Sequence, residues 1–163
     1  MKRITPILIV IVIALAAAIW WFSPKQVVKR RTATLLRTLT LESGTGKAGR
    51  QMGVYSLNAL LAKDVSLENP TIQEANGSFD REELGSAFSW ICEQAKQTKF
   101  ELQSIHSITV EGSQADISFS LNALAEMPNY RPADGEYEVV FRWNHDDQEG
   151  WRLSRAEWKE ARK

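Results

Sequence analysis

The sequence predicts an α+β domain behind an N-terminal membrane helix, and three observations support this. Ile4–Phe22 is an uncharged, apolar stretch of 19 residues. Between Pro24 and Ala95 most apolar residues recur at helical spacing, whereas from Phe100 onward they alternate with polar residues. Long alternating strands joined in series by turns indicate an antiparallel sheet. We therefore expect three helices packed on a curved, mostly antiparallel sheet.

The charge is divided unevenly along the chain. Residues 1–31 carry six Lys and Arg and no acid, for a net charge of +6, while residues 32–163 carry 14 Lys and Arg against 20 Asp and Glu, for a net charge of −6. An acidic body argues against nucleic acid as its ligand. A single cysteine, Cys92, excludes an intrachain disulfide and the common zinc clusters. We expect no metal site and no cofactor.

The N-terminal stretch has the length of a membrane span. As a helix of about 1.5 Å per residue, Ile4–Phe22 would extend about 28 Å, close to the thickness of a bilayer core. Trp20, Trp21 and Phe22 stand where an interfacial aromatic belt belongs. The alternative is a cleaved signal peptide, because Ala16–Ala18 offers a small-residue cleavage site. Apolar residues continue past that site, so we expect an uncleaved anchor over residues 1–23 and a folded domain over residues 24–163.

The orientation of the anchor remains open. Lys2 and Arg3 precede it, and Lys25, Lys29, Arg30 and Arg31 follow it, so a count of Lys and Arg favours a cytoplasmic domain. A very short tail before a first hydrophobic segment behaves instead as a signal anchor that exports the body. We expect a single-pass protein of the bacterial inner (cytoplasmic) membrane with a periplasmic, extracytoplasmic domain.

The helices of the body have recognisable starts and faces. Ser23-Pro24 begins helix one, which carries an apolar stripe. Gly44, Gly46 and Gly49 have the GxGxxG spacing but follow a helix, so we expect a loop and not a nucleotide site. Helix two is expected from Arg50 to Lys63. Asp80 and Glu83 form a capping-box pattern that starts helix three. Its apolar face consists of Leu84, Ala87, Phe88, Ile91 and Ala95, with Cys92 at the edge as a small buried thiol.

Strands are expected on both sides of helix three. Val65–Asn69 alternates, and a return strand at Thr71–Glu74 leads to a turn at Asn76-Gly77. After helix three, alternation defines the face that covers the helices. Its expected members are Phe100, Leu102, Ser104, His106, Ile108 and Val110, then Ala115, Ile117, Phe119 and Leu121, then Tyr137, Val139, Phe141 and Trp143, then Trp151, Leu153 and Arg155.

The order of elements and three short stretches resemble the nuclear transport factor 2-like superfamily, a cystatin-like α+β fold that includes ketosteroid isomerase and scytalone dehydratase. Ala59–Pro70, ALLAKDVSLENP, resembles the isomerase segment in which a helix end is followed by a strand that carries the general base. Phe141–Asn144, FRWN, and Arg155–Trp158, RAEW, resemble its later strands. The resemblance covers roughly residues 24–158 and implies a cone-shaped domain.

The catalytic groups of the isomerase are missing at the matching positions. Its general base would fall on Asn69, whose amide cannot accept the required proton. Its oxyanion-stabilising protonated carboxyl would fall near Val139, and helix one contains no tyrosine. The histidine–aspartate dyad of the dehydratase cannot be assigned either. The resemblance therefore implies the fold without this chemistry.

Five residues are candidates for a ligand-binding pocket inside the cone. They are Asn69, His106, Tyr137, Trp143 and Arg155, with Arg155 as a charge and His106 as a proton donor or acceptor for an anionic or carbonyl ligand. The alternative is structural: His106 is a satisfied core histidine, Asn69 bonds the backbone, and Arg155 pairs with Glu157 or an inner acid.

Two functions are therefore open. The first is a membrane-tethered, non-catalytic binding or scaffolding domain. In plan it is similar to the single-span inner-membrane assembly protein of type IV secretion systems. The second is a small-molecule-binding protein or an enzyme of isomerase, hydrolase or dehydratase type that uses the cone. The expected partners are the membrane, through Ile4–Phe22, and a second copy or a membrane-protein complex, through the open sheet face.

Overall fold

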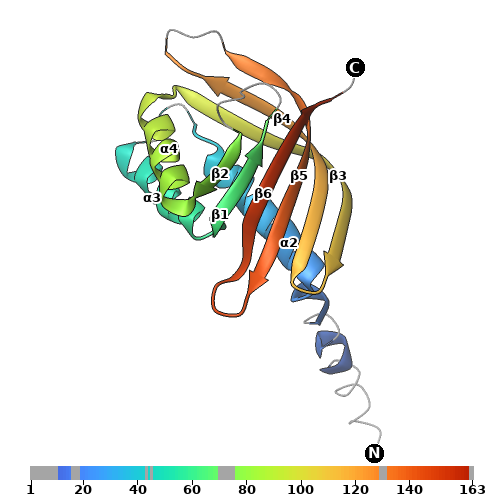
Figure 1. Ribbon diagram of the computed structural model, residues 1–163. Coiled ribbons are helices and arrows are strands. Elements are labelled where there is room, and N and C mark those ends of the chain that lie inside the picture. Colours follow the sequence, from blue (N-terminus) through green and yellow to red (C-terminus); the bar gives the residue numbers. More distant parts are fainter. Residues whose placement is uncertain are drawn as a thin grey trace, which may run out of the picture.

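The computed structural model describes residues 11–15, 19–42, 44, 46–69, 76–128 and 132–161. Its body is a six-stranded mixed sheet with helices against one face (Figure 1). The helices are α2 (Pro24–Leu39), α3 (Lys47–Asn58) and α4 (Arg81–Gln94). The strands are β1 (Leu61–Glu68), β2 (Gly77–Asp80), β3 (Gln97–Glu111), β4 (Gln114–Glu126), β5 (Ala133–Asp146) and β6 (Gly150–Glu160).

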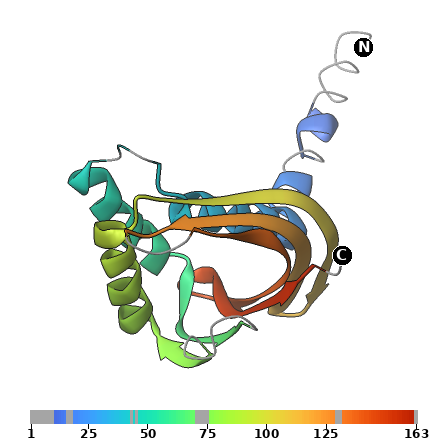
Figure 2. The same ribbon diagram turned by 90° about the horizontal axis from the view of Figure 1, so that it is seen from above.

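The sheet has the strand order β2-β1-β6-β5-β4-β3. Every neighbouring pair is antiparallel except β1 and β6, which run parallel. The long strands bend around α2, which packs against β3, β4 and β6, while α3 and α4 lie together beside them (Figure 2). The predicted α+β class and mostly antiparallel sheet are confirmed.

The core lies between the concave face of the sheet and the helices. Its largest fully buried side chains are Trp143, Phe119 and Phe141, and the rings of Phe119 and Phe141 meet edge to face with centroids 5.0 Å apart. α2 contributes Val28, Leu35 and Leu36 to this core. Burial of so much apolar surface is the main favourable term in folding.

The starts of two helices follow the sequence signals. Pro24 occupies the first turn of α2, where its missing N–H would have no partner in any case. Asp80 and Glu83 form the predicted capping box at the start of α4, in which the Asp80 carboxylate accepts from the Glu83 N–H at 2.7 Å and the Glu83 carboxylate accepts from the Asp80 N–H at 2.9 Å.

The predicted end of helix two is wrong. α3 ends at Asn58, and Leu61 to Lys63 begin strand β1. The reason is tertiary: the Leu153 N–H donates to the Leu60 carbonyl at 2.8 Å, and Leu61 pairs with Leu153 of β6. The predicted return strand at Thr71–Glu74 lies outside the described residues. The predicted turn at Asn76-Gly77 is corrected, because Gly77 is already the first residue of β2, with a φ of 146°.

The region before α2 is described in part. Residues 11–15 and 19–21 are helical, and Ile19, Trp20, Trp21 and Phe22 are exposed. Across the described residues, no single helix has both the length and the apolar character of a membrane span. The helices Ile11–Trp21 and Pro24–Leu39, bent by 54° at the break between them, meet the length and composition test only as a pair.

Candidate functional site

An apolar pocket of about 370 Å³ opens between the helices and the sheet. α2 contributes Leu35 and Leu39 to its wall, and α4 contributes Leu84 and Ile91. Trp158 of β6 lies in the wall on the sheet side, together with other apolar side chains of β1, β5 and β6. The pocket therefore lies inside the curved sheet, in the part of the domain where a ligand can be surrounded by apolar side chains.

The sequence builds this pocket from two helical stripes and alternating strands. Leu84, Ala87, Phe88 and Ile91 recur at i, i+3, i+4 and i+7 on α4 and all line the pocket. Sequence analysis identified this face as core. The structure shows that only Phe88 of the four is fully buried, while Ala87 is exposed. A small residue amid a large apolar stripe is the one sequence signal that could have indicated a space there.

The polar side chains of the pocket wall are Glu68 and Asn69, at the end of β1. The Glu68 carboxylate pairs with the Arg155 guanidinium at 2.8 Å. The backbone N–H of Asn69 donates to the side-chain oxygen of Asn76. Both residues therefore stand at the rim of an otherwise apolar wall, which can hold an apolar molecule but offers little chemistry beyond this one end.

The structure does not bring the five candidate residues together. Of the five, only Asn69 lines the pocket. Trp143 is fully buried in the core, and its indole N–H has no partner among the described residues. Tyr137 is half-buried and packs edge to face on Trp158, with ring centroids 5.8 Å apart. His106 and Arg155 lie on the other, convex face of the sheet.

Irregularities of the β-bulge type explain why His106 and Arg155 face outward. Between Leu102 and Ser104, and again between Ile105 and Ser107, β3 has one residue more than its partner strand β4. Ile105 consequently pairs with the buried Phe119, and His106 turns outward. A similar extra residue in β6 places Arg155 opposite Arg142 on the outer face and Ala156 opposite Phe141 in the core. A bulge shifts every later side chain to the opposite face.

The outer face carries a polar network that sequence analysis did not detect. His106 Nε2 lies 2.7 Å from Ser120 Oγ and 2.9 Å from a Glu138 carboxylate oxygen. Farther along the same face, the Arg142 guanidinium donates two bonds to Asp116, at 2.8 and 2.9 Å, which raises the pKa of Arg142. Arg155 contacts Glu157 at 3.5 Å, as the structural alternative for this residue expected. A homodimer through this face remains a prediction.

Cys92 is a buried thiol at the contact between α4 and α3. Its side chain is 4% exposed, and burial raises its pKa, so the reactive thiolate is disfavoured. Arg50 of α3 donates to the backbone carbonyls of Cys92 and Ala95 at the end of α4. Within the described part of the chain, no group of His, Cys, Asp and Glu is arranged to hold a metal ion.

Comparison with solved structures identifies the fold. A nuclear transport factor 2-like superfamily protein from Salmonella enterica superposes with a TM-score of 0.66 at 14% identity, covering 85% of this chain and 92% of its own. The fold is that of nuclear transport factor 2. An uncharacterised protein with a cystatin-like fold from Caulobacter vibrioides matches with a TM-score of 0.62 at 12% identity, over 83% of this chain and 87% of its own.

A third solved structure bears the name of a candidate enzyme. It is a candidate scytalone dehydratase from Novosphingobium aromaticivorans, with a TM-score of 0.62 at 14% identity, covering 83% of this chain and 82% of its own. Neither a protein-family model nor a curated protein matches the chain. Identities this low show a common fold, and a nuclear transport factor 2-like fold hosts unrelated activities, so function has to be argued from the site itself.

Proposed function

We propose that this chain is a membrane-tethered binding domain whose pocket takes a small apolar molecule without converting it. The lining of the pocket carries the proposal. Its wall is almost entirely Leu, Val, Ile, Phe, Ala and Trp, and its volume of about 370 Å³ lies within the range of small-molecule sites. A molecule held there gains from leaving water in proportion to the apolar surface that it buries.

The polar end of the pocket supports binding in preference to catalysis. Asn69 stands where the resemblance to ketosteroid isomerase places the general base, and its amide has no basic lone pair for proton abstraction. Glu68 is the one titratable side chain of the wall, and it is held by Arg155 at 2.8 Å. An apolar ligand needs no charged partner, and no charged side chain of the described wall faces the interior of this pocket.

The tether rests on the N-terminal region. The uncharged stretch Ile4–Phe22 has the length of a span, and the exposed aromatic residues at its end suit a membrane interface. We place the anchor in the bacterial inner membrane and the domain on its extracytoplasmic side. The tether would hold the pocket near apolar molecules that are dissolved in or released from the bilayer.

A second candidate is an enzyme of isomerase, hydrolase or dehydratase type that uses the same pocket. The similarity in fold to a candidate scytalone dehydratase favours it. In this case Asn69 would orient the substrate, because the Glu68 carboxylate pairs with Arg155 on the convex face. A turnover that Asn69→Ala abolishes would support this candidate over binding alone.

Photolabelling tests the binding proposal on the full chain in lipid nanodiscs. The probe is trifluoromethyl-phenyl-diazirine, a small apolar molecule that inserts into nearby bonds on illumination. We expect labelled peptides from α4 and β1, which line the pocket, and from Ile4–Phe22, which would lie in lipid. Label in Ile4–Phe22 tests the tether separately from the pocket.

Two substitutions on α4 make a matched pair for this experiment. Ala87→Trp fills the pocket, whereas Ser86→Trp adds the same ring at an exposed neighbour outside it. We expect Ala87→Trp to remove the label from β1 and Ser86→Trp to leave it. Equal labelling of β1 in the two variants would overturn the proposed pocket.

A further inference from the structure

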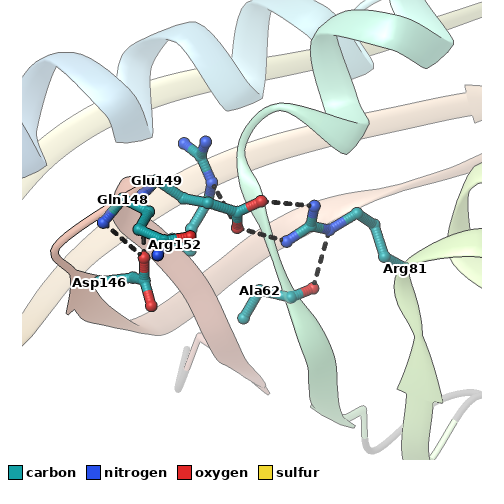
Figure 3. A network of polar contacts seen from close by, with 6 residues as sticks. All are labelled: Ala62, Arg81, Asp146, Gln148, Glu149 and Arg152. Carbon is teal, nitrogen blue, oxygen red and sulfur yellow. Dashed lines mark hydrogen bonds and ion pairs between the residues drawn. The ribbon is translucent and has the colours of Figure 1, made fainter.

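A polar network connects the turn between β5 and β6 to α4 and β1 (Figure 3). Arg81, the first residue of α4, donates to both carboxylate oxygens of Glu149, at 3.1 and 2.7 Å, and to the Ala62 carbonyl at 3.4 Å. The Asp146 carboxylate accepts from the backbone N–H groups of Gln148 and Glu149, at 2.8 and 2.9 Å. Arg152 lies on β6 directly after this turn, so the turn sets the position of the Arg152 backbone.

Two arginines from different elements converge beside this turn. The Arg31 guanidinium of α2 lies beside Gly150, 3.6 Å from the position that a Cβ on this residue would occupy. Arg152 is 15% exposed at its side chain, and Figure 3 shows its guanidinium and the Asp146 carboxyl pointing in opposite directions from the turn. Asp147 is fully exposed and 3.8 Å from His145.

Among the described residues, neither guanidinium group has a carboxylate to itself. Arg152 has only a 3.4 Å contact to Glu149, whose carboxylate is already engaged by Arg81. Among the described residues no carboxylate lies within ion-pair distance of Arg31. Burial and the positive charge of Arg152 together lower the pKa of Arg31. Such an arrangement costs stability unless an anion completes it.

The same end of α2 meets the expected membrane interface. The Arg30 guanidinium stacks on the Trp21 ring at 4.5 Å from its centroid, so side chains of this helix turn do reach back to the exposed aromatic residues. Helical side chains lean toward the N-terminus of their helix. Lys25 and Lys29 are exposed on the first turns of α2. The whole end is basic and adjoins an apolar stretch.

We propose that Arg31 and Arg152 bind the phosphate of an anionic phospholipid headgroup, while Lys25, Lys29 and Arg30 add positive charge to the same end of α2. Guanidinium groups form paired bonds to phosphate oxygens, and basic residues beside a membrane anchor favour an anionic lipid surface. The contact holds the domain at a defined orientation on the bilayer. This inference rests on the proposed membrane tether.

Native mass spectrometry of the full chain in nanodiscs tests the proposal. The nanodiscs contain phosphatidylglycerol and phosphatidylcholine, and the ratio of the two lipids retained on the protein is measured. Each basic residue near an anionic surface contributes about 1 kcal/mol, so Arg31→Gln and Arg152→Gln are each expected to lower the phosphatidylglycerol preference about fivefold. Arg37→Gln is the control, because Arg37 is exposed on the last turn of the same helix.

Three outcomes would overturn this proposal. One is an unchanged lipid ratio in Arg31→Gln. Another is an equal loss in the Arg37→Gln control. The third is protection of residues 146–152 from hydrogen exchange by inorganic phosphate in phosphatidylcholine nanodiscs, with no further protection by phosphatidylglycerol, because the site would then serve a free anion.

Two further measurements separate this inference from the proposed tether and from a structural role. The first is extraction of membranes with alkaline carbonate. Release of the chain by this treatment would refute the proposed tether. If the chain stays in the membrane and Arg31→Gln leaves the lipid ratio unchanged, only the proposed lipid site is refuted. In phosphatidylcholine nanodiscs Arg31→Gln is expected to unfold at no lower temperature than the wild type, because it relieves an uncompensated charge. A marked loss of stability there would instead assign Arg31 a structural role and refute the lipid site.

Discussion

Two buried threonines predict opposite effects of the same substitution. Thr32 on α2 is 1% exposed, and its hydroxyl has no hydrogen-bond partner among the described residues. Thr98 on β3 is 4% exposed, and its hydroxyl donates to the Leu39 carbonyl at 2.6 Å and accepts from the Leu41 N–H at 3.0 Å. Valine has the same shape as threonine and lacks only the hydroxyl.

The sign of each effect follows from these partners. Thr32→Val replaces a buried, unpaired hydroxyl by a methyl group, so the free energy of unfolding should rise by about 1 kcal/mol. Valine and threonine have similar helix propensities, so the helix itself adds little. Thr98→Val leaves the Leu39 carbonyl at the end of α2 without this donor and should lower the free energy of unfolding by about 1–3 kcal/mol.

Thermal unfolding of the full chain in nanodiscs, followed by circular dichroism, measures both effects. At this chain length 1 kcal/mol corresponds to a shift in Tm of about 2–4 °C. The two variants should therefore move Tm in opposite directions from the wild type. A lower Tm for Thr32→Val, or an unchanged Tm for Thr98→Val, would refute this account of the two hydroxyls.

Three further predictions test the capping box, the turn network and the bulge. Asp80→Ala should lower the free energy of unfolding by about 1 kcal/mol in thermal unfolding, because the first turn of α4 loses its cap. Asp80→Asn should keep most of the stability of the wild type, because asparagine is also a good N-cap residue. Hydrogen bonds from Arg81 lower the pKa of Glu149 below its ordinary value of 4.5, so this carboxylate stabilises the fold above that pH and the effect is lost as pH falls below it. The Tm of Glu149→Gln should consequently fall less on acidification than that of the wild type, and an identical pH profile would contradict this. Ile105→Lys should destabilise the domain by more than about 2 kcal/mol, because the bulges turn Ile105 inward. His106→Lys should be nearly neutral to Tm, because a lysine on the outer face can still pair with Glu138. The reverse order would contradict the observed register.

The sequence predicted local features where the signal is local. The capping box of Asp80 and Glu83 acts within one helix turn, and Pro24 restricts only its own turn. The alternation of β4 and β5 continues without a bulge, so their inward residues, such as Phe119 and Trp143, were identified correctly. The resemblance in Ala59–Pro70 led to the fold that the solved structures confirm.

The candidate site was predicted less well, and the reasons are tertiary. Asn69 does line the pocket, whereas His106 and Arg155 do not, because single extra residues in β3 and β6 reverse the faces of these side chains. The alternation of polar and apolar residues in the sequence does not show where a bulge occurs. The end of α3 was misplaced for a similar reason, since pairing with β6 takes Leu61 into a strand.

The amino-acid sequence alone determined the α+β class, the capped start of α4 and the separation of a basic, apolar head from an acidic body, because propensity, periodicity and charge act between near neighbours. Tertiary structure decided which side chains share a surface. It opened an apolar pocket behind the stripe of α4 and brought Arg31 and Arg152 together from positions far apart in the chain. Such meetings depend on strand register and helix packing, which are set by contacts summed over the whole domain.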